Sequence, residues 1–462
     1  MTDWWDVARV TIDNLPEVAL LEIFDFYTVG GYIEGWQTLV HVCRKWRNVV
    51  FGSPRRLGLQ LLCKARTPVR ETLDVWPPLP IVISATDDEE CGDDGMTNII
   101  AALEHNDRIS SIDVTGAPSS HSEQVLEAME QPFPALKFLE LVYEDRTLPV
   151  LPASFLGGSA PSLEGLWLLR IPFPGLPKLL LSATHLVVLQ VWNIPHSGYI
   201  SPEVMVTCLS VLTGLQAFHI GFESPQSRPD RRLPHPQTRT LLPVLDTLQF
   251  RGVSEYLEDL VARINVPLLN ELEITFFHQL MLDTPQLNQF IIRTPRFNAR
   301  DRAYVQFSNS AVSVKLLPTS GGEYGLELVM LCGQSDWQLS SLAQVCSSSF
   351  SQALISAVEH LYIIDRATRS QLHWQDDIES SQWLELLQPF TGVRDFYISR
   401  EFTPRIAPVL QELVEERATE VLLPALETVF LQEEYLSGST IEHFVAARQL
   451  AGHPVAVSRW IW

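Results

Sequence analysis

Residues 163–192 read LEGLWLLRIPFPGLPKLLLSATHLVVLQVW and contain the spacing L-x-x-L-x-L twice, beginning at Leu163 and at Leu186, with Val191 closing the second copy. With aliphatic or aromatic substitutes, this spacing begins seven times from Ile109 to Leu269, at intervals of 23 to 30 residues. A period in the twenties is typical of leucine-rich repeats, in which each unit combines one short strand with a helical or irregular return. The sequence therefore predicts an α/β fold whose main part is an irregular leucine-rich-repeat solenoid.

The spacing begins again, after a gap, at Val358, Val393 and Leu426. Residues 97–295 are therefore assigned to a first repeat array, and residues 338–462 to further repeats and a C-terminal cap. Between the copies, apolar residues recur at helical spacing and predict helical returns. These returns are expected over residues 203–213, 254–264, 340–358, 382–387 and 408–417.

Three segments stand out from this alternation. IPFPGLPKLLL (residues 171–181) is rich in proline and predicts a return that is not helical. Residues 296–337 contain AYVQF, AVSVKLL and YGLELVML, whose apolar patterns predict paired strands. They are interpreted as a β-rich insertion or as degenerate repeats, and the sequence leaves both open. At the C-terminus, STIEHFVAARQLAG predicts a helix that stops at a glycine, followed by the strand-like VAVSRWIW.

The first 65 or so residues have a different, helical pattern. Asn14 and Pro16 mark a helix start, and apolar residues then recur every three or four positions as far as Phe24. After Gly30-Gly31, a second helix is predicted over residues 36–50. Its apolar stripe consists of Leu39, Val42, Cys43, Trp46, Val49 and Val50.

Read together, LPEVALLEIFDFY (residues 15–27) and WQTLVHVCRKWRNVVFGSP (residues 36–54) resemble the F-box. That family's pattern opens with Leu-Pro and an aliphatic run, and it ends in a Val-Cys-Arg-x-Trp-Arg helix followed by Ser-Pro. A glycine-containing insertion over residues 28–35 replaces the family's compact link. The resemblance implies a domain over residues 11–64 that docks on a Skp-type adaptor and, through it, on a cullin. The adaptor-binding residues that it implies are Leu15, Pro16, Val18, Leu20, Ile23, Phe24, Leu39, Val42, Cys43 and Trp46.

Further segments resemble the large set of F-box proteins of mushroom-forming fungi (basidiomycetes): SPRRLGLQLLC, TPVRETLDVWPPLPIVI, FLGGSAPSLEGLWL, FRGVSEYLEDLVARI and IEHFVAARQLAG. This resemblance implies an F-box, a linker over residues 65–96 and a repeat array that binds a protein substrate. The function expected is that of a substrate-recognition subunit of an SCF-type cullin-RING ubiquitin ligase. The alternative is a leucine-rich-repeat scaffold whose F-box acts outside a ubiquitin ligase.

Composition and motifs exclude several other functions. The chain has no Walker loop, dinucleotide-binding glycine motif, zinc-protease motif or nucleophile elbow, so no enzyme activity and no cofactor are expected. Its six cysteines lack metal-ligand spacing and the density of a disulfide framework, which predicts no metal and reduced thiols. A net charge of -22 argues against nucleic acid and membrane surfaces as partners. With no targeting or membrane-spanning pattern, a cytoplasmic and/or nuclear protein is expected.

Candidate substrate-binding residues follow from the repeat geometry. The position between the second and third apolar sites of each copy faces away from the core, and large side chains there are candidate interface anchors. Trp167, His219, Tyr362 and Tyr397 hold such positions, although cover by neighbouring loops is an equal alternative. Replacing the three aromatic residues by Ala is expected to change stability little. A second candidate is the basic loop RPDRRLPHPQTR, which contains Arg231 and Arg232. The alternative interpretation is a solvated loop without a binding role.

Overall fold

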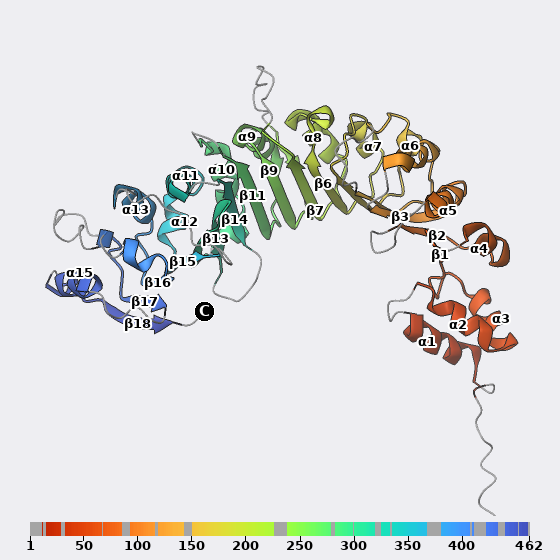
Figure 1. Ribbon diagram of the computed structural model, residues 1–462, viewed down its shortest axis with the longest axis horizontal. Helices are drawn as coiled ribbons and strands as arrows, with labels where there is room; N and C mark the ends of the chain where they lie inside the picture. Colours follow the sequence, from red (N-terminus) through yellow and green to blue (C-terminus); the bar gives the residue numbers. More distant parts are fainter. Residues whose placement is uncertain are drawn as a thin grey trace, which may run out of the picture. The chain divides into compact units, whose positions relative to one another are not determined.

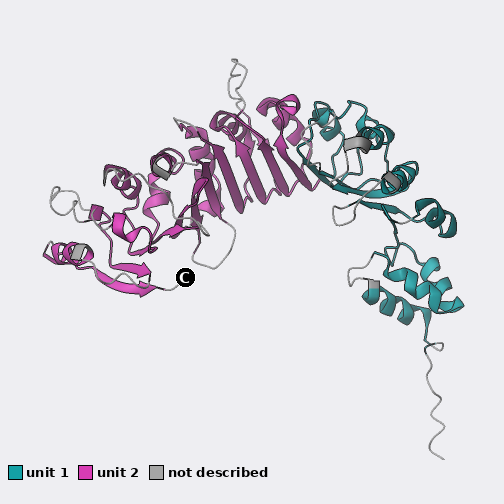
Figure 2. Ribbon diagram, in the orientation of Figure 1, with its two compact units in different colours: residues 1–185 teal, residues 186–462 magenta. Residues whose placement is uncertain are grey.

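The computed structural model shows a mixed α/β chain in two compact units, residues 1–185 and residues 186–462 (Figures 1 and 2). Each unit contains a mostly parallel sheet, and the mixed α/β class predicted from the sequence is confirmed. The residues that the structure describes are 12, 15–28, 33–66, 68–85, 93–115, 119–142, 150–225, 238–278, 282–298, 300–318, 325–332, 335–366, 380–406, 409–410, 422–432, 439–450 and 452–460.

The first unit opens with a module of three helices, α1 (Glu17–Thr28), α2 (Gly35–Val42) and α3 (Arg44–Gly52), which pack on one another. Its core has an aromatic contact at its centre, where the rings of Phe24 and Trp46 lie 4.8 Å apart. The fully or almost fully buried side chains are Leu20, Leu21, Phe24, Trp36, Leu39, Val40, Val49 and Val50.

The single helix predicted over residues 36–50 is wrong, because the chain breaks at Cys43. This residue has an extended backbone (φ -158°, ψ 170°) that ends α2 and begins α3. Its Sγ accepts a hydrogen bond from the backbone N–H of Trp46 at 3.5 Å, which is an N-cap interaction. The break turns the predicted apolar stripe, so that Val42 points into solvent while Leu39 and Val49 stay buried.

The parallel sheet of the first unit begins earlier than predicted. Its strands pair in chain order, and the helices lie in the returns between them (Figure 1). The strands are β1 (Leu61–Lys64), β2 (Ile81–Ala85), β3 (Ile109–Thr115), β4 (Phe138–Val142) and β5 (Gly165–Leu169). The helical segments are α4 (Val69–Val75), α5 (Asp93–Leu103), α6 (Ser119–Ala128), the 3-10 turn η2 (Phe155–Gly158) and α7 (Leu176–Leu180).

Two of these elements correct the assignments made from the sequence. The segment over residues 65–96, which was assigned to a linker, contains α4 and β2. IVISA lacks the full repeat spacing, but a short apolar run is sufficient to form a buried strand. The Pro-rich return over residues 171–181 contains the helix α7. Pro177 lies in the first turn of that helix, where the missing N–H is tolerated.

The second unit continues the same alternation of strand and helix. Its main sheet has the strand order β6-β7-β9-β11-β14-β13-β12-β15-β16-β17-β18. These strands are β6 (Val188–Ile194), β7 (Ala217–Phe222), β9 (Thr247–Gly252), β11 (Glu271–Phe277), β12 (Arg302–Phe307), β13 (Ala311–Leu317), β14 (Leu326–Leu331), β15 (His360–Asp365), β16 (Asp395–Ile398), β17 (Thr428–Gln432) and β18 (Ala456–Trp460). A second small sheet pairs β8 (Thr240–Leu241) with β10 (Ile264–Asn265).

The helices of the second unit match most of the predicted returns. They are α8 (Pro202–Leu209), α9 (Ser254–Arg263), α10 (Pro285–Ile292), α11 (Ser335–Ser348), α12 (Gln352–Ser356), α13 (Ser380–Leu387) and α15 (Ser439–Leu450), with 3-10 turns η3 (His196–Gly198) and η4 (Pro295–Phe297). Most of the return predicted over residues 408–417 lies outside the described residues. The predicted terminal helix and strand are confirmed as α15 and β18.

Residues 296–337 form a β-rich insertion that stays within the sheet. β12, β13 and β14 pair antiparallel, whereas β14 pairs parallel with β11 and β12 parallel with β15. The chain therefore moves three strands along after β11, returns through two hairpins, and then crosses back through α11 to β15. Its strands form a three-stranded antiparallel meander between the parallel-paired strands β11 and β15.

The two faces of the second sheet differ. Alternate residues point toward the helices: Phe307 of β12 packs on Trp383 of α13 with ring centroids 6.1 Å apart. The residues between them, such as Tyr304, point to the opposite face, which we call the open face. Side chains on the helix side are almost all fully buried, whereas those on the open face are mostly half-buried. This difference places the core between the sheet and the helices.

Candidate functional site

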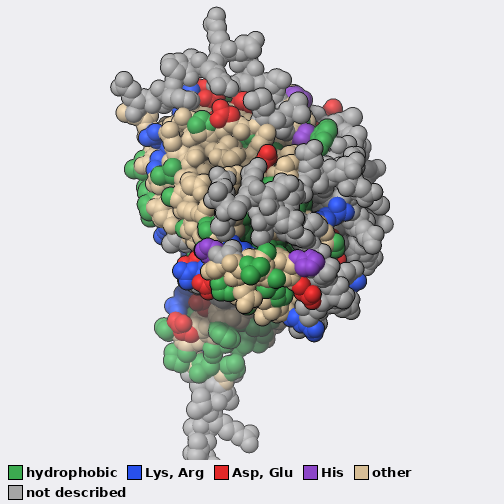
Figure 3. All heavy atoms as spheres, turned by 90° about the vertical axis from the view of Figure 1, so that its left-hand side faces the viewer, with side chains coloured by type: hydrophobic (Ala, Val, Ile, Leu, Met, Phe, Trp, Pro, Cys, Tyr) green, Lys and Arg blue, Asp and Glu red, His purple; other side chains and the backbone are tan. Residues whose placement is uncertain are grey.

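Helix α1 exposes large apolar side chains next to the ones that it buries. Phe24 is fully buried, while Phe26, two residues further on, is 87% exposed. The exposed apolar residues of the module are Val18, Ile23, Phe26, Tyr27, Ile33 and Val42, and we call them the module surface. Figure 3 shows hydrophobic side chains gathered over these helices.

The ten residues predicted to bind an adaptor divide into two groups. Leu20, Phe24 and Leu39 are buried and form the module core in the isolated chain, and their contact with an adaptor stays a prediction. Cys43 caps α3, and half-buried Trp46 packs on Phe24. The half-buried Leu15 is held by its carbonyl, which accepts a hydrogen bond from Lys45 Nζ at 2.9 Å. The exposed members are Pro16, Val18, Ile23 and Val42.

Sequence reasoning missed Phe26 and Tyr27 as surface residues. The helical period predicted the buried stripe through Leu20 and Phe24. Phe26 and Tyr27 lie off that stripe, and an aromatic residue that interrupts the polar side of an amphipathic helix was the available signal.

A second surface is a row of side chains that crosses the open face of the second unit. Register pairs each residue with its neighbour on the next strand, and every member of the row from Gln190 to Phe430 is half-buried. In spatial order the row is Gln190, His219, Gln249, Glu273, Glu327, Lys315, Tyr304, Tyr362, Tyr397, Phe430 and Ser458. The predicted outward positions of His219, Tyr362 and Tyr397 are therefore confirmed.

Four aromatic rings of this row stack on one another, and we call them the ladder. Tyr304 and Tyr362 have ring centroids 4.4 Å apart and planes 7° apart. Tyr362 lies 4.1 Å from Tyr397, which lies 4.3 Å from Phe430, with equally small angles. Burial raises the pKa of the Tyr362 hydroxyl, and the neighbouring tyrosines add to this effect. The ladder rings therefore cover most of one another's faces, and ring edges and hydroxyls form its outer surface.

Trp460 of β18 braces the ladder from the side. Its ring lies at 76° to that of Tyr397 and at 67° to that of Tyr362, with centroids 5.6 and 6.2 Å away. Its Nε1–H donates a hydrogen bond to the carbonyl of Ile398 at 3.2 Å. The Trp460 side chain thus reaches from β18 across β17 to β16, which is two strands away in the sheet.

Carboxylates lie beside the ladder in the same row. Glu273 of β11 is opposite Glu327 of β14, and Lys315 Nζ lies 3.4 Å from Glu327 Oε2. Burial raises the pKa of Glu273, and the negative charges of Glu327 and Glu271 raise it further, while Lys315 opposes them. One lysine therefore faces three carboxylates at this end of the ladder.

His219 lies on the outward side of its strand, as predicted, but its imidazole carries no charge at neutral pH. Burial lowers its pKa to about 4, so the imidazole is neutral at pH 7. Its Nε2 is buried and has no hydrogen-bond partner among the described residues. The nearby Trp192 lies across Gly221, since a Cβ there would be only 2.2 Å from the indole Cε3. Its ring centroid is 6.0 Å from that of His219.

The open face of the first unit has a related arrangement. Asp113, Glu140 and Trp167 are opposite one another on β3, β4 and β5. Burial raises the pKa values of both carboxyl groups. Trp167 is half-buried on the outward side, as predicted, and its ring lies across Gly165, where a Cβ would be 2.3 Å from Cη2. Arg231 and Arg232 lie outside the described residues.

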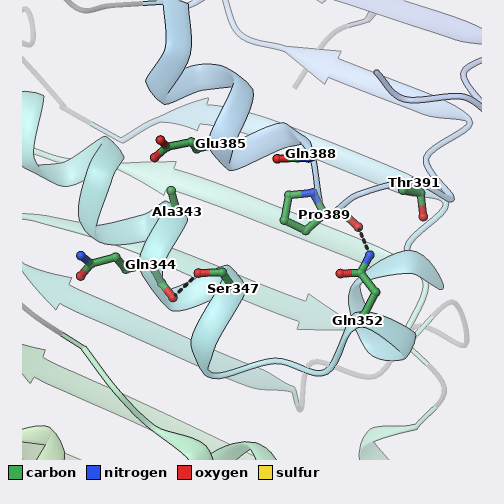
Figure 4. A pocket seen from close by; sticks show the side chains of 8 residues that line it. All are labelled: Ala343, Gln344, Ser347, Gln352, Glu385, Gln388, Pro389 and Thr391. Atoms are coloured by element: carbon green, nitrogen blue, oxygen red, sulfur yellow. Dashed lines mark hydrogen bonds between the residues drawn. The ribbon is translucent and has the colours of Figure 1, made fainter. Parts of the chain in front are cut away.

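On the helix side, α11 and α13 border a polar cleft of about 560 Å³. Figure 4 shows the Gln344 carbonyl accepting a hydrogen bond from Ser347, while Gln352 donates one to the carbonyl of Pro389. Of its lining side chains, only that of Glu385 is ionisable. This cleft therefore offers amide and hydroxyl groups but no set of residues for acid–base chemistry.

Within the described ranges, no three His, Cys, Asp or Glu residues come together in a way that could hold a metal ion. No disulfide bond joins the cysteines in these ranges, which are Cys43, Cys63, Cys208, Cys332 and Cys346. None of the described helices combines the length and hydropathy needed to cross a membrane. Neither models of known protein families nor curated protein sequences give a match to this chain.

Proposed function

We propose that this protein is a non-enzymatic substrate-recognition subunit of an SCF-type cullin-RING ubiquitin ligase. In this proposal the helices α1–α3 are an F-box whose module surface docks on a Skp-type adaptor. The strands and helices that follow form an irregular leucine-rich-repeat solenoid, and its open face binds the protein substrate. The subunit accelerates ubiquitin transfer by holding the substrate close to the conjugating enzyme.

The observation that carries this proposal is the module surface. A module of about 40–50 residues has a small core and gains little from folding alone. It nevertheless leaves Phe26, Ile23 and Val18 in water, although the same helix buries Leu20 and Phe24. Each exposed large apolar side chain forgoes about 1.5–3 kcal/mol that burial against a partner would release. The choice of a Skp-type adaptor as the partner is supported by the resemblance of the VCRKWR segment (residues 42–47) and the LPEVALLEIF segment (residues 15–24) to the F-box.

The test is co-purification of tagged full-length chain with a Skp-type adaptor. Replacing both Val18 and Ile23 by Asp places two charges on the module surface, and we expect adaptor recovery to fall at least tenfold. Leu181→Asp is the matched control, since Leu181 is 46% exposed and Ile23 47%, yet Leu181 lies outside the module. Equal adaptor recovery by the double variant and the control would refute the proposal.

The same experiment separates the ligase subunit from the alternative, a repeat scaffold whose F-box acts outside a ligase. A ligase subunit brings the cullin together with the adaptor, and the double variant loses both. Adaptor without cullin, reproduced at saturating adaptor, identifies the scaffold.

A further inference from the structure

We propose that the open face of the second unit binds an extended protein segment in which a Lys or Arg lies three or four residues from a large apolar side chain. The basic side chain pairs with Glu273 and Glu327, and the apolar side chain packs along the ladder. This inference rests on the proposed function in that it names the chemical class of the substrate held by the same face.

The shape of the row favours an extended segment. Its members from Glu273 to Phe430 lie on seven neighbouring strands, so they form a continuous line across the sheet. With about 4.8 Å between strands, this line is about 29 Å long. A chain that rises about 3.3 Å per residue covers that length with about nine residues. The line matches an extended chain lying across the strands.

The charges at one end of the row select a cation. Glu271, Glu273 and Glu327 share the single Lys315 within this part of the row, and the Lys315 contact is to Glu327. A half-buried carboxylate beside other carboxylates gains most from a new positive partner, because desolvation and repulsion both oppose its charge. An acidic or phosphorylated segment would meet repulsion at this end, and the net charge of -22 adds to it over longer range.

The ladder excludes ligands that need a flat aromatic platform. Nucleobases and sugar rings bind by stacking on ring faces, but Tyr362 and Tyr397 each have both faces covered by neighbours about 4 Å away. Ring edges, hydroxyls and the perpendicular Trp460 form a ridged surface instead. Aliphatic and aromatic side chains of a polypeptide fill such a surface, and tyrosine hydroxyls can hydrogen-bond to its backbone.

The strand register determines the distance between the carboxylates of Glu273 and Glu327 and the first ring of the ladder. Tyr304 is two strands from Glu327 and three strands from Glu273, which corresponds to about 10 and 14 Å. An extended chain covers these distances in three to four residues. The first unit repeats the combination independently, since Asp113 and Glu140 lie in register with Trp167 on its own open face.

The test is selection of random twelve-residue peptides displayed on phage against the full-length chain. We expect enriched peptides to contain Lys or Arg three or four positions from Trp, Tyr, Phe or Leu. A fluorescein-labelled consensus peptide should bind the wild type and lose at least tenfold in affinity to the Glu273→Gln/Glu327→Gln variant and to Tyr397→Ala. Its affinity should also fall as salt rises from 50 to 500 mM. Burial and neighbouring carboxylates oppose the charge of Glu273, whereas the Glu327 substitution also gives up the contact with Lys315, so melting curves verify that the double variant is folded.

Matched controls separate this inference from the adaptor proposal. Glu385→Gln removes the same charge on the helix side, and Tyr27→Ala removes an aromatic ring from the module surface. Both should bind the peptide within twofold of wild type, while Tyr27→Ala weakens adaptor recovery. Melting curves verify that Tyr397→Ala is folded at the assay temperature.

The inference is overturned if no peptide is enriched over uncoated support, if enriched peptides are acidic, or if the open-face variants bind as well as the wild type. It is also overturned if single-stranded RNA or an oligosaccharide binds and Tyr397→Ala removes that binding. Adaptor binding can fail while the peptide result stands, because the selection is performed without adaptor.

Discussion

The module surface and the ladder both expose aromatic residues, but they do so in opposite ways. On α1, Phe26 and Tyr27 extend into water while the core lies beneath Phe24. On the sheet, Tyr304, Tyr362, Tyr397 and Phe430 cover one another at spacings of 4.1–4.4 Å. Among the described residues the helix gives its exposed rings no ring contact, whereas strand pairing places each ladder ring directly opposite the next.

This difference indicates how far each surface depends on a partner. The ladder obtains packing energy within the chain, so it is stable alone and offers a preformed surface. Within the described residues the module surface has no such internal compensation, and in the proposed function its apolar area is buried by the adaptor. The two regions should therefore respond differently to the same kind of substitution.

The largest effect is expected for the buried member of the α1 pair. Phe24→Ala removes a fully buried ring that contacts Trp46, and it should cost about 3–5 kcal/mol of module stability. Phe26→Ala should change stability by no more than about 0.5 kcal/mol while weakening adaptor recovery. Urea denaturation followed by tryptophan fluorescence measures both. Equal destabilisation by the two substitutions would contradict the assignment of Phe24 to the module core and of Phe26 to its exposed surface.

A smaller effect is expected within the ladder. Tyr362 stacks on two rings and Phe430 on one, so Tyr362→Ala should cost about 1–3 kcal/mol and Phe430→Ala about half as much. This revises the sequence-based expectation that replacing such residues changes stability little, which assumed isolated exposed side chains. Thermal unfolding of both variants tests the order. If neither variant lowers the melting temperature, the ladder does not stabilise the sheet.

The smallest effect concerns pH. His219 has a pKa of about 4 in the folded chain and an ordinary value near 6.5 when unfolded, so the unfolded state binds the proton more readily. Above pH 6.5 this residue has no effect on the pH dependence, and between pH 6.5 and 4 it removes stability as the pH falls. Allowing for its partial exposure, the loss is about 1–2 kcal/mol. His219→Gln should flatten this part of the stability curve, and identical curves for both chains would contradict the assignment.

The sequence predicted the repeating parts of the fold because one strand spacing recurs. On the parallel strands that carry the repeat spacing, outward residues such as His219, Tyr362 and Tyr397 could be read from the sequence, since a strand alternates its faces with a period of two. The row across β12, β13 and β14 could not. Lys315 and Tyr304 enter it only because two hairpins reverse the chain, and that depends on pairing between distant segments.

Other features escaped prediction for local reasons. β1 and β2 lack the complete repeat spacing and were assigned to the F-box and a linker. The break at Cys43 interrupts a stretch whose apolar spacing fits one helix, and a backbone cap decides it. The ladder itself depends on four aromatic residues being in register, which requires the strand order as well as the face of each strand.

The meander of β12–β14 also has a consequence for the order in which the chain is made. β11 ends at Phe277, and its partner β14 begins only at Leu326, about fifty residues later. At a synthesis rate of about 5–20 residues per second, several seconds pass between the synthesis of β11 and that of its partner strand β14. A simple repeat array extends one unit at a time. In this sheet, β12 and β13 are synthesised before β14, so the pairing of β11 with β14 comes later. The nascent chain is thus most vulnerable to wrong strand pairing in this interval, before residues 326–331 emerge from the ribosome.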